Sequence, residues 1–312
     1  MPLAQIVLTL ERMDQYHHHS GHTGDAGHSG QAGHSSHIGH SSHGDADSDA
    51  SVAEVLDLDA EVIGSFLDDL TGWAAGHAKA APRRVLDVGA GTGTGTLALA
   101  RRFPAAELIA LDRSPTMLDC LQNAAASHGI ADRLRSVQAD LDTATWPEQE
   151  IGTVDLAWAA LSLHHFAAPD RVLADLYMAV NPGGLLVVVE MDAMPRFLPE
   201  GVHPGLEDRC REAAARNGWN AWPNWTGHLE RAGFTVAEER TFSINVDPAP
   251  PAANRLAHRI TSGMRDRLAD QLSADDLAAL DRLLDPADEE FLGRRGDLVV
   301  RGARTAWAAH RP

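Results

Sequence analysis

Cysteine is scarce in this chain of 312 residues, which contains only Cys120 and Cys210. The two cysteines are far apart in the sequence and form no Cys-x-x-Cys pair. The sequence therefore predicts no disulfide framework, and this usage is typical of a protein in a reducing compartment such as the cytoplasm.

Long apolar runs are also missing, since no run reaches the roughly 20 residues that a membrane-spanning helix needs. The first residues, MPLAQIVLTLERMDQ, hold a short apolar patch without a basic flank or a small-residue cleavage site. They make a poor signal peptide. We therefore expect a cytoplasmic protein with no membrane span.

Positive charge is in short supply: the chain has 26 Lys and Arg residues but 44 Asp and Glu residues, so its formal net charge is −18. Such a field repels the phosphate backbone of nucleic acids, so we expect no nucleic-acid partner. The hydrophobic content of 44% is ordinary for a globular protein, and the length allows one large or two ordinary domains.

Residues 1–52 are predicted to form a disordered tract, because residues 16–51 are mostly Gly, Ser, His and Asp. Such a composition buries too little apolar surface to offset the entropy of ordering. His34, His37, His40 and His43 recur every third residue, and neutral imidazoles in such a tract can bind Zn²⁺ or Ni²⁺ adventitiously. We expect a solvated tail without a defined metal site, and keep a metal-binding or carrier protein as an alternative.

A helical cap is predicted over residues 53–83, and the rest of the chain, 84–312, is predicted to be one domain. The cap has apolar residues that can line one side of a helix or helix pair, and Pro82 lies in the break at its end. These apolar residues are Val55, Leu56, Ile63, Phe66, Leu70 and Trp73.

Strands and helices then alternate, which predicts an α/β fold with a parallel sheet covered on both faces. We place strands near 84–88, 107–112, 134–138, 153–158 and 185–191, and helices near 93–103, 115–127, 169–180 and 224–232. A strand over 234–246 and a final strand over 297–309 enclose a helical insert at about 252–290, within which Ser273 starts a capped helix.

Glycines 89, 91, 93 and 95 follow the first strand and indicate a nucleotide-binding loop. The dinucleotide pattern Gly-x-Gly-x-x-Ala is matched only from Gly93, four residues after the glycine that should end the strand. Counted from Gly89, the third position of that pattern is Thr94. A nicotinamide-dependent oxidoreductase therefore stays as the weaker alternative.

The segment from Asp87 to Gly93 resembles the first motif of the class I S-adenosylmethionine-dependent methyltransferases. A second strand ends in Asp112, which lies 23 residues after Gly89, and a third ends in Asp140. Ser114-Pro115-Thr116-Met117-Leu118 is similar to the family's segment after the second acid, and Pro182-Gly183-Gly184 to the turn before its fifth strand. The resemblance extends over about residues 84–191.

This resemblance implies a Rossmann-like fold with a mostly parallel seven-stranded sheet, and S-adenosylmethionine as cofactor. It places Asp87 near the methionine ammonium, Asp112 on both ribose hydroxyls and Asp140 on the adenine amino group, with Leu141 packed on the ring. The full set of expected cofactor-binding residues is Asp87, Gly89, Ala90, Gly91, Gly93, Asp112, Arg113, Met117, Asp140, Leu141 and Ala159.

The acceptor expected from the resemblance is a small molecule, methylated on oxygen, nitrogen or carbon. The Asn/Asp-Pro-Pro-aromatic segment of enzymes that methylate exocyclic nitrogens of nucleobases is missing after the fourth strand. No Asp-Asn pair follows the fifth strand, so we expect no Mg²⁺ site. Leu163-His164-His165 is instead similar to a segment frequent in the branch that acts on quinones and natural products.

His164 and His165 are the candidate catalytic residues, because they follow the fourth strand where an open α/β sheet holds its ligands. We expect His164 before His165 to act as a general base. Three tryptophans, Trp219, Trp222 and Trp225, line either a substrate pocket or the core. Glu207, Arg209 and Arg211 are interpreted as a solvated helix face.

Overall fold

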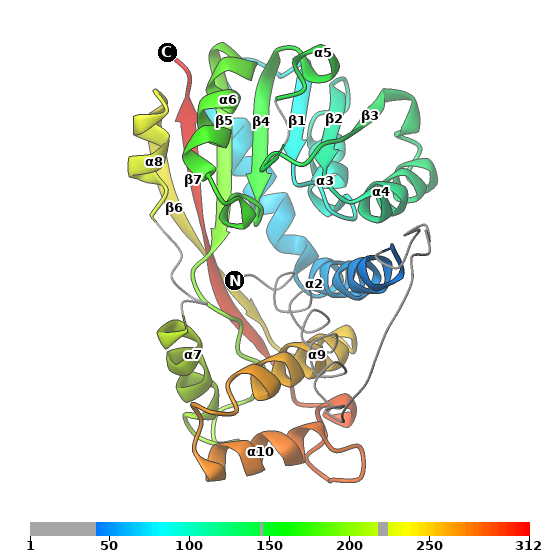
Figure 1. Cartoon of the computed structure of the whole chain (residues 1–312), viewed down its shortest axis with the longest axis vertical. Helices are drawn as coiled ribbons and strands as arrows, with labels where there is room; N and C mark the ends of the chain where they lie inside the picture. The colour runs from blue at the N-terminus through cyan, green and yellow to red at the C-terminus, as the bar shows by residue number, and fades with distance from the viewer. Residues whose placement is uncertain (1–41, 144–145, 218–223) are drawn as a thin grey trace, which may run out of the picture.

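The computed structural model describes residues 42–143, 146–217 and 224–312, with the backbone alone for 42–48. Its centre is a seven-stranded sheet in the order β3-β2-β1-β4-β5-β7-β6 (Figure 1). Neighbours from β3 through β5 are parallel, whereas β7 runs antiparallel to both β5 and β6. The strands are β1 Arg84–Val88, β2 Glu107–Asp112, β3 Leu134–Gln138, β4 Val154–Ala160, β5 Val180–Met191, β6 Thr235–Val246 and β7 Val300–His310.

The predicted alternation of strands and helices is confirmed within one or two residues at most boundaries. The four helices predicted after strands are α3 Thr94–Arg102, α4 Pro115–Ser127, α6 Pro169–Ala179 and α8 Thr226–Arg231. Two further helices, α5 Glu148–Ile151 and α7 Leu206–Arg216, lie outside the predicted ranges. The turn expected at 181–184 is an irregularity inside β5, because Val154 pairs with Val180 but Leu156 already pairs with Leu185.

Each face of the sheet buries its own apolar cluster, since successive side chains of a strand point to opposite faces. Val85, Leu108 and Val187 pack toward α3 and the cap helix, while the alternate residues Leu86, Ile109 and Val188 pack toward α6 and α8. This two-sided burial explains why the central strands consist of nearly continuous apolar runs.

The cap is one long helix, α2 Ser42–His77, with non-helical backbone angles at Ile63. The helix begins at Ser42, eleven residues before the expected start of the cap at residue 53. The physical reason is packing: Val52 and Val55 are buried against the body, and Ser114 donates a hydrogen bond to the carboxylate of Asp49. His34, His37 and His40 lie outside the described residues, as do the side chains up to Ser48.

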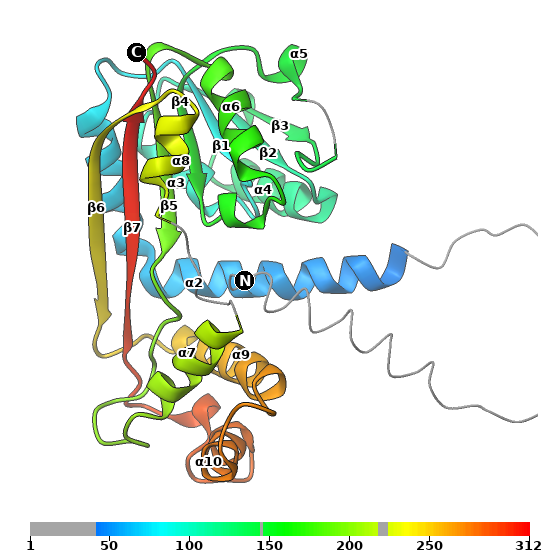
Figure 2. The same ribbon diagram turned by 60° about the vertical axis from the view of Figure 1, so that its left-hand side comes forward.

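The predicted helical insert is confirmed between β6 and β7 as α9 Ala252–Arg267 and α10 Ala274–Leu284. Figure 2 shows α2 crossing the molecule between the sheet and a group formed by α7, α9 and α10. The carboxylate of Asp276 pairs with Arg209 of α7 at 2.7 Å, and Glu207 accepts the backbone N–H of Phe197 at 2.6 Å. Both side chains therefore attach α7 to the body. Glu207 is partly buried, contrary to the expected solvated face, whereas Arg209 stays exposed as expected.

Among the described residues, no helix is long and apolar enough to span a membrane.

Candidate functional site

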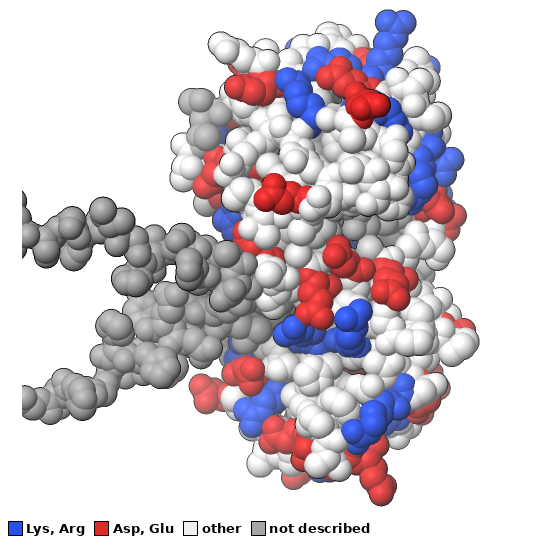
Figure 3. All heavy atoms as spheres, turned by 90° about the vertical axis from the view of Figure 1, so that its right-hand side faces the viewer, with Lys and Arg blue, Asp and Glu red and all other residues white. Residues whose placement is uncertain are grey.

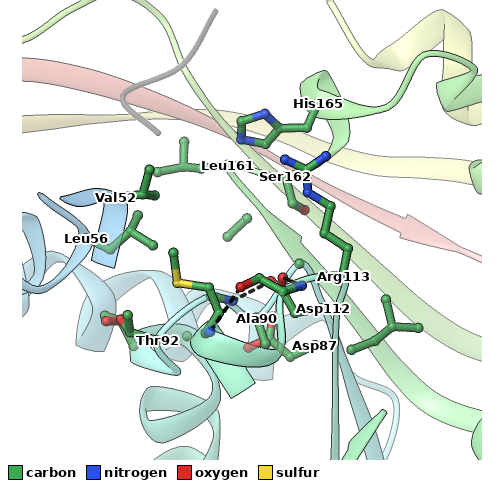
Figure 4. A pocket seen from close by; sticks show the side chains of 18 of the residues that line it. Val52, Leu56, Asp87, Ala90, Thr92, Asp112, Arg113, Leu161, Ser162 and His165 are labelled. Atoms are coloured by element: carbon green, nitrogen blue, oxygen red, sulfur yellow. Dashed lines mark hydrogen bonds between the residues drawn. The ribbon is translucent and has the colours of Figure 1, made fainter. Parts of the chain in front are cut away.

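A cavity lies at the carboxyl edge of the parallel strands, next to the switch point between β1 and β4 where the strand order reverses. Its walls come from the loop after β1, the ends of β2, β3 and β4, the segment after β4, and α2. Figure 4 shows Val52 and Leu56 of α2 on one side of this space and Arg113 and His165 on the other, with Asp112 near its floor.

The glycine loop after β1 forms the floor. Gly89, Gly91 and Gly93 all have positive φ angles, of 70°, 53° and 96°, which side-chain-bearing residues rarely adopt. A Cβ atom on Gly89 would lie 2.5 Å from Cβ of Ser162, and one on Gly91 would lie 3.0 Å from Leu56. The loop therefore needs glycine both for its backbone angles and for its close approach to two walls of the cavity.

Asp112 ends β2 and connects the loop to the sheet. One carboxylate oxygen accepts the N–H of Gly91 at 2.9 Å and the other accepts the N–H of Ser114 at 2.9 Å. Burial raises the pKa of Asp112 above its ordinary value, and the two backbone donors oppose that shift. Each oxygen retains a second lone pair, so the carboxylate still has room for the two hydroxyls of a ribose.

Asp87 lies beneath the loop and is 4% exposed. Its carboxylate accepts the hydroxyl of Thr96 at 2.6 Å. Desolvation raises the pKa of Asp87 to about 7, against the hydrogen bond from Thr96 and with some repulsion from Asp112. A cation placed in the cavity beside this carboxylate would favour its charged form.

Asp140 and Leu141 follow β3 and line the same cavity. Asp140 accepts the N–H of Asp142 at 3.0 Å, and Asp142 accepts the N–H of Ala167 at 2.8 Å. This chain of backbone contacts orients Asp140 beside the buried side chain of Leu141. An acid next to an apolar side chain suits an adenine ring and its amino group.

The roof of the cavity is α2, which contributes mainly apolar side chains. Val52, Leu56, Ile63 and Leu67 line the space, together with the acids Asp49 and Asp59. The periodicity of 52–77 predicted a helix, but nothing in the sequence says which part of the molecule that helix covers. The insert contributes no residue to this cavity; it packs against α2 from outside, where Arg259 pairs with Glu54.

The two candidate histidines occupy different environments. His165 lines the cavity, and burial, followed by the neighbouring His164 and Arg113, lowers its pKa well below 6.5. His164 does not line the cavity; its Nδ1 lies 2.5 Å from a carboxylate oxygen of Glu190, behind the cavity wall. Burial lowers the pKa of His164 to about 3 and raises that of Glu190, so we interpret this contact as a hydrogen bond between uncharged groups. The geometry therefore favours His165 over His164, the reverse of the expected order.

Most of the expected cofactor residues come together. Nine of the eleven line the cavity: Asp87, Gly89, Ala90, Gly91, Asp112, Arg113, Met117, Asp140 and Leu141. Gly93 instead caps the N-terminus of α3, and Ala159 is fully buried beneath the wall that its neighbour Ala160 forms. Trp225 is a core residue with no exposed surface, while Trp219 and Trp222 lie outside the described residues.

Three further cavity residues give no signal in the sequence. Ser162 lies against the glycine loop, Trp158 is buried near Asp87, and Arg304 comes from β7. Each is separated from the glycine loop by more than 60 residues and belongs to a strand or turn of ordinary composition. Only the fold brings them to the site.

Within the described part of the chain, no group of three or more His, Cys, Asp and Glu side chains is arranged to hold a metal ion.

Comparison with known proteins gives a consistent result. Residues 85–184 match the model of a family described as "Methyltransferase domain". The chain is 31% identical over 230 residues to trans-aconitate 2-methyltransferase of Methylobacterium radiotolerans, a match that covers 73% of this chain and 80% of that protein. It is 34% identical over 116 residues to demethylmenaquinone methyltransferase of Thermus thermophilus, covering 37% of this chain and 50% of that protein.

The chain thus spans about half the length of the second relative and most of the first. Among solved structures, it is similar to a SAM-dependent methyltransferase from Thiobacillus denitrificans in complex with S-adenosyl-L-homocysteine, with 17% identity and a TM-score of 0.44 over 78% of this chain and 90% of that one.

Proposed function

Because the chain belongs to the class I S-adenosylmethionine-dependent methyltransferases, we propose that it transfers a methyl group from S-adenosylmethionine to an oxygen, nitrogen or carbon atom of a small-molecule acceptor. The observation that carries this proposal is the floor of the cavity. There the carboxylate of Asp112 holds the N–H groups of Gly91 and Ser114, and the glycine loop passes close to both the roof and Ser162.

The residues present fit the cofactor. In this proposal Asp112 binds the ribose hydroxyls, Asp140 accepts from the adenine amino group and Leu141 packs on the ring. Asp87 faces the methionine ammonium, which compensates for the desolvation of its carboxylate. When bound, the cofactor supplies an electrophilic methyl group on a sulfonium centre.

The remaining residues of the cavity orient the acceptor and exclude water. The apolar side of α2 covers the space from above, so a reacting pair beneath it is held in place, which by itself accelerates transfer. His165, kept uncharged by burial, is placed to accept a proton from an acceptor hydroxyl or amine.

The small-molecule class is supported by the cavity and by charge. The cavity lies under a helix whose lining segment is fixed at two points, by the bond from Ser114 to Asp49 and by the pair of Asp59 with Arg304. On the face that Figure 3 shows, Lys and Arg side chains are mixed with Asp and Glu rather than gathered into one continuous patch. With a net charge of −18, such a surface does not favour nucleic acid.

A cytoplasmic location is part of the same proposal, supported by the cysteine usage. Both cysteines are free, and burial raises the pKa of each thiol. The alternatives from the sequence were a nicotinamide-dependent oxidoreductase and a metal carrier. No described feature of the site supports either of them.

The test is cofactor preference. S-adenosylmethionine or S-adenosylhomocysteine at 100 times its Kd should stabilise the protein by about 2.7 kcal/mol, measured as a rise in Tm, while NADH gives no shift. Stabilisation by NADH alone would contradict the proposal.

Calorimetry on two variants locates the nucleoside. Asp112→Ala and Asp140→Ala should each weaken S-adenosylhomocysteine binding by about 1.5–3 kcal/mol, the range for hydrogen bonds to charged groups. Asp112→Ala should cost more, because it also frees the N–H groups of Gly91 and Ser114. Wild-type affinity in the Asp112 variant would mean that the ribose lies elsewhere.

A further inference from the structure

Arg304 stands in the half of the cavity that the nucleoside contacts do not use. Asp112 and Asp140 follow β2 and β3, on one side of the switch point between β1 and β4. Arg304 lies on the other side, on β7, where it pairs in register with Met191 at the carboxyl end of β5. This side of the cavity is where an acceptor has room beside the cofactor.

The guanidinium of Arg304 is buried, and not all of its N–H donors have an acceptor in the described part of the chain. The residue is 6% exposed, and its Nη2 donates to the carboxylate of Asp59 on α2 at 2.7 Å. Its Nε is buried without an acceptor among the described residues. A buried donor without a partner costs free energy, and a ligand that supplies an acceptor recovers that cost.

Apart from Asp59 and the buried carboxyl of Glu190, on which its charge acts, this guanidinium has apolar neighbours. Its carbon centre lies 5.3 Å from the ring of Phe66, and Ile63 lines the cavity beside it. Arg304, Asp59 and Ile63 also line a second, smaller cavity whose other walls include Ile244, Leu256 and Val300. An ion pair that only attaches α2 to β7 would explain the bond to Asp59. It would not explain why Arg304 lines two cavities or why its buried Nε has no acceptor among the residues that the structure describes.

We propose that Arg304 binds a carboxylate of the methyl acceptor, with an apolar remainder of the acceptor against α2. This inference rests on the proposed methyltransferase function. A guanidinium offers a planar array of N–H donors that matches a carboxylate, so Arg304 can keep its bond to Asp59 and donate from Nε to a second carboxylate. A single negative charge fits better than a phosphate dianion, because Arg113 and Arg304 are the only Lys or Arg side chains among the described residues lining a cavity that also holds several acids.

The experiment compares carboxylates with amides of the same shape. Benzoate and benzamide, and octanoate and octanamide, are titrated by calorimetry into the full-length protein with and without saturating S-adenosylhomocysteine. We expect at least one carboxylate to bind the loaded protein tenfold or more tightly than its amide. Equal affinity within both pairs overturns the inference.

Two variants with opposite expected effects separate recognition from structural support. Arg304→Gln should abolish the preference for carboxylate, whereas Asp59→Asn, which removes the competing carboxylate, should strengthen carboxylate binding severalfold. A merely structural ion pair predicts the same direction for both. The matched control is Arg301→Gln on the same strand; Arg301 pairs with Glu200 outside this cavity, so its variant should keep the preference.

The affinity for S-adenosylhomocysteine reports on the fold and on the proposed function separately. It should stay within threefold of wild type in every variant. In Arg304→Gln the partly buried carboxylate of Asp59 loses its partner, which can prevent that variant from folding. The double variant Asp59→Asn with Arg304→Gln removes both charges together and avoids this problem. It should also lack the preference for carboxylate. If the wild type does not bind S-adenosylhomocysteine, the proposed function is contradicted. If it does bind, and the carboxylate preference persists in Arg304→Gln or in the double variant, only the assignment of Arg304 is overturned.

Discussion

Gly89 combines two constraints at one residue, a φ of 70° and a wall formed by Ser162. Gly129 has almost the same φ, 68°, but a Cβ there would meet no atom within 4 Å. Gly129→Ala should therefore cost only backbone strain, about 1–2 kcal/mol. Gly89→Ala should cost a further 1–3 kcal/mol, roughly the range for overpacking, because its Cβ would lie 2.5 Å from that of Ser162.

Denaturant unfolding and calorimetry check this pair. Gly129→Ala should bind S-adenosylhomocysteine with wild-type affinity, while Gly89→Ala should bind it at least tenfold more weakly, because the loop that forms the cavity floor must move away from Ser162. Equal losses of stability in the two variants would show that the contact with Ser162 carries no cost.

Asp87 predicts a pH dependence whose sign differs between folding and binding. The pKa of its carboxyl is about 7 in the folded protein, above its ordinary value of 3.8. Between these values the folded state binds the extra proton, so this group makes the protein less stable as pH rises from 4 to 7. A ligand ammonium beside Asp87 requires the charged form, so ligand affinity should change in the opposite direction.

The affinity for S-adenosylhomocysteine should accordingly fall as pH drops below 7, approaching about tenfold per pH unit. Asp87→Asn should bind more weakly than wild type at pH 8 and show a flattened profile. A wild-type profile that is already flat between pH 5 and 8 would place the ammonium away from Asp87.

The adjacent histidines should respond differently to replacement. His165→Ala should reduce turnover by roughly 10²–10⁴-fold while cofactor affinity stays within about threefold, as expected for a general base. Because the pKa of His165 is well below 6.5, wild-type turnover at saturating S-adenosylmethionine should not fall near pH 6.5 but only at lower pH. His164→Ala should mainly lower Tm, because it leaves the buried carboxyl of Glu190 without this contact. Full turnover in His165→Ala would leave positioning as the whole mechanism.

At the scale of elements, α2 determines how much of the N-terminal segment the protein needs. The first described side chains that contact the body are Asp49 and Val52. Deletion of residues 1–41 should therefore leave Tm and cofactor affinity nearly unchanged, because residues 16–41, which join the short apolar patch at the start to α2, offer little apolar surface to dock. Deletion of residues 1–56 removes Val52 and Leu56 from the roof and should lower both. Loss of affinity in the shorter deletion, measured by calorimetry, would assign the tract a role in the site.

The elements that the sequence predicts well are those with local signals. The strands before Gly89 and Asp112 are short apolar runs that end in a turn or an acid, so both their position and the edge that they share follow from the chain alone. The place of α2 in the roof depends on contacts such as those of Leu56 with Gly91 and of Asp49 with Ser114, and the contribution of Arg304 depends on its contact with Asp59, 245 residues away. The sequence has no periodic signal for such packing between separate segments. The order of His164 and His165 was equally unpredictable, since a short 3-10 turn at Leu163–His165 decides which ring faces the cavity.

At the scale of the whole molecule, the binding half and the covering half of the site come from different parts of the chain. The strands β1 to β3 carry the acids that we propose bind the nucleoside, and β7 supplies Arg304, while α2 crosses the molecule between the sheet and the group of α7, α9 and α10 (Figure 2). Asp49 and Asp59 of α2 connect these two parts, through Ser114 and Arg304 respectively. The insert supports α2 from the opposite side through Arg259 and Glu54. Closure of the site is therefore a property of the assembled molecule, which no isolated segment carries.

The position of β7 between β5 and β6 has a consequence for biosynthesis. The partner of Leu185–Met191 is Arg304–His310, so a nascent chain exposes the valine-rich edge of β5 until its last strand has been translated. At the usual rate of translation this takes on the order of 10 s. During that interval unpaired backbone groups and apolar side chains together form a template for aggregation. A chain truncated before residue 300 would leave this edge open permanently, so we expect it to aggregate.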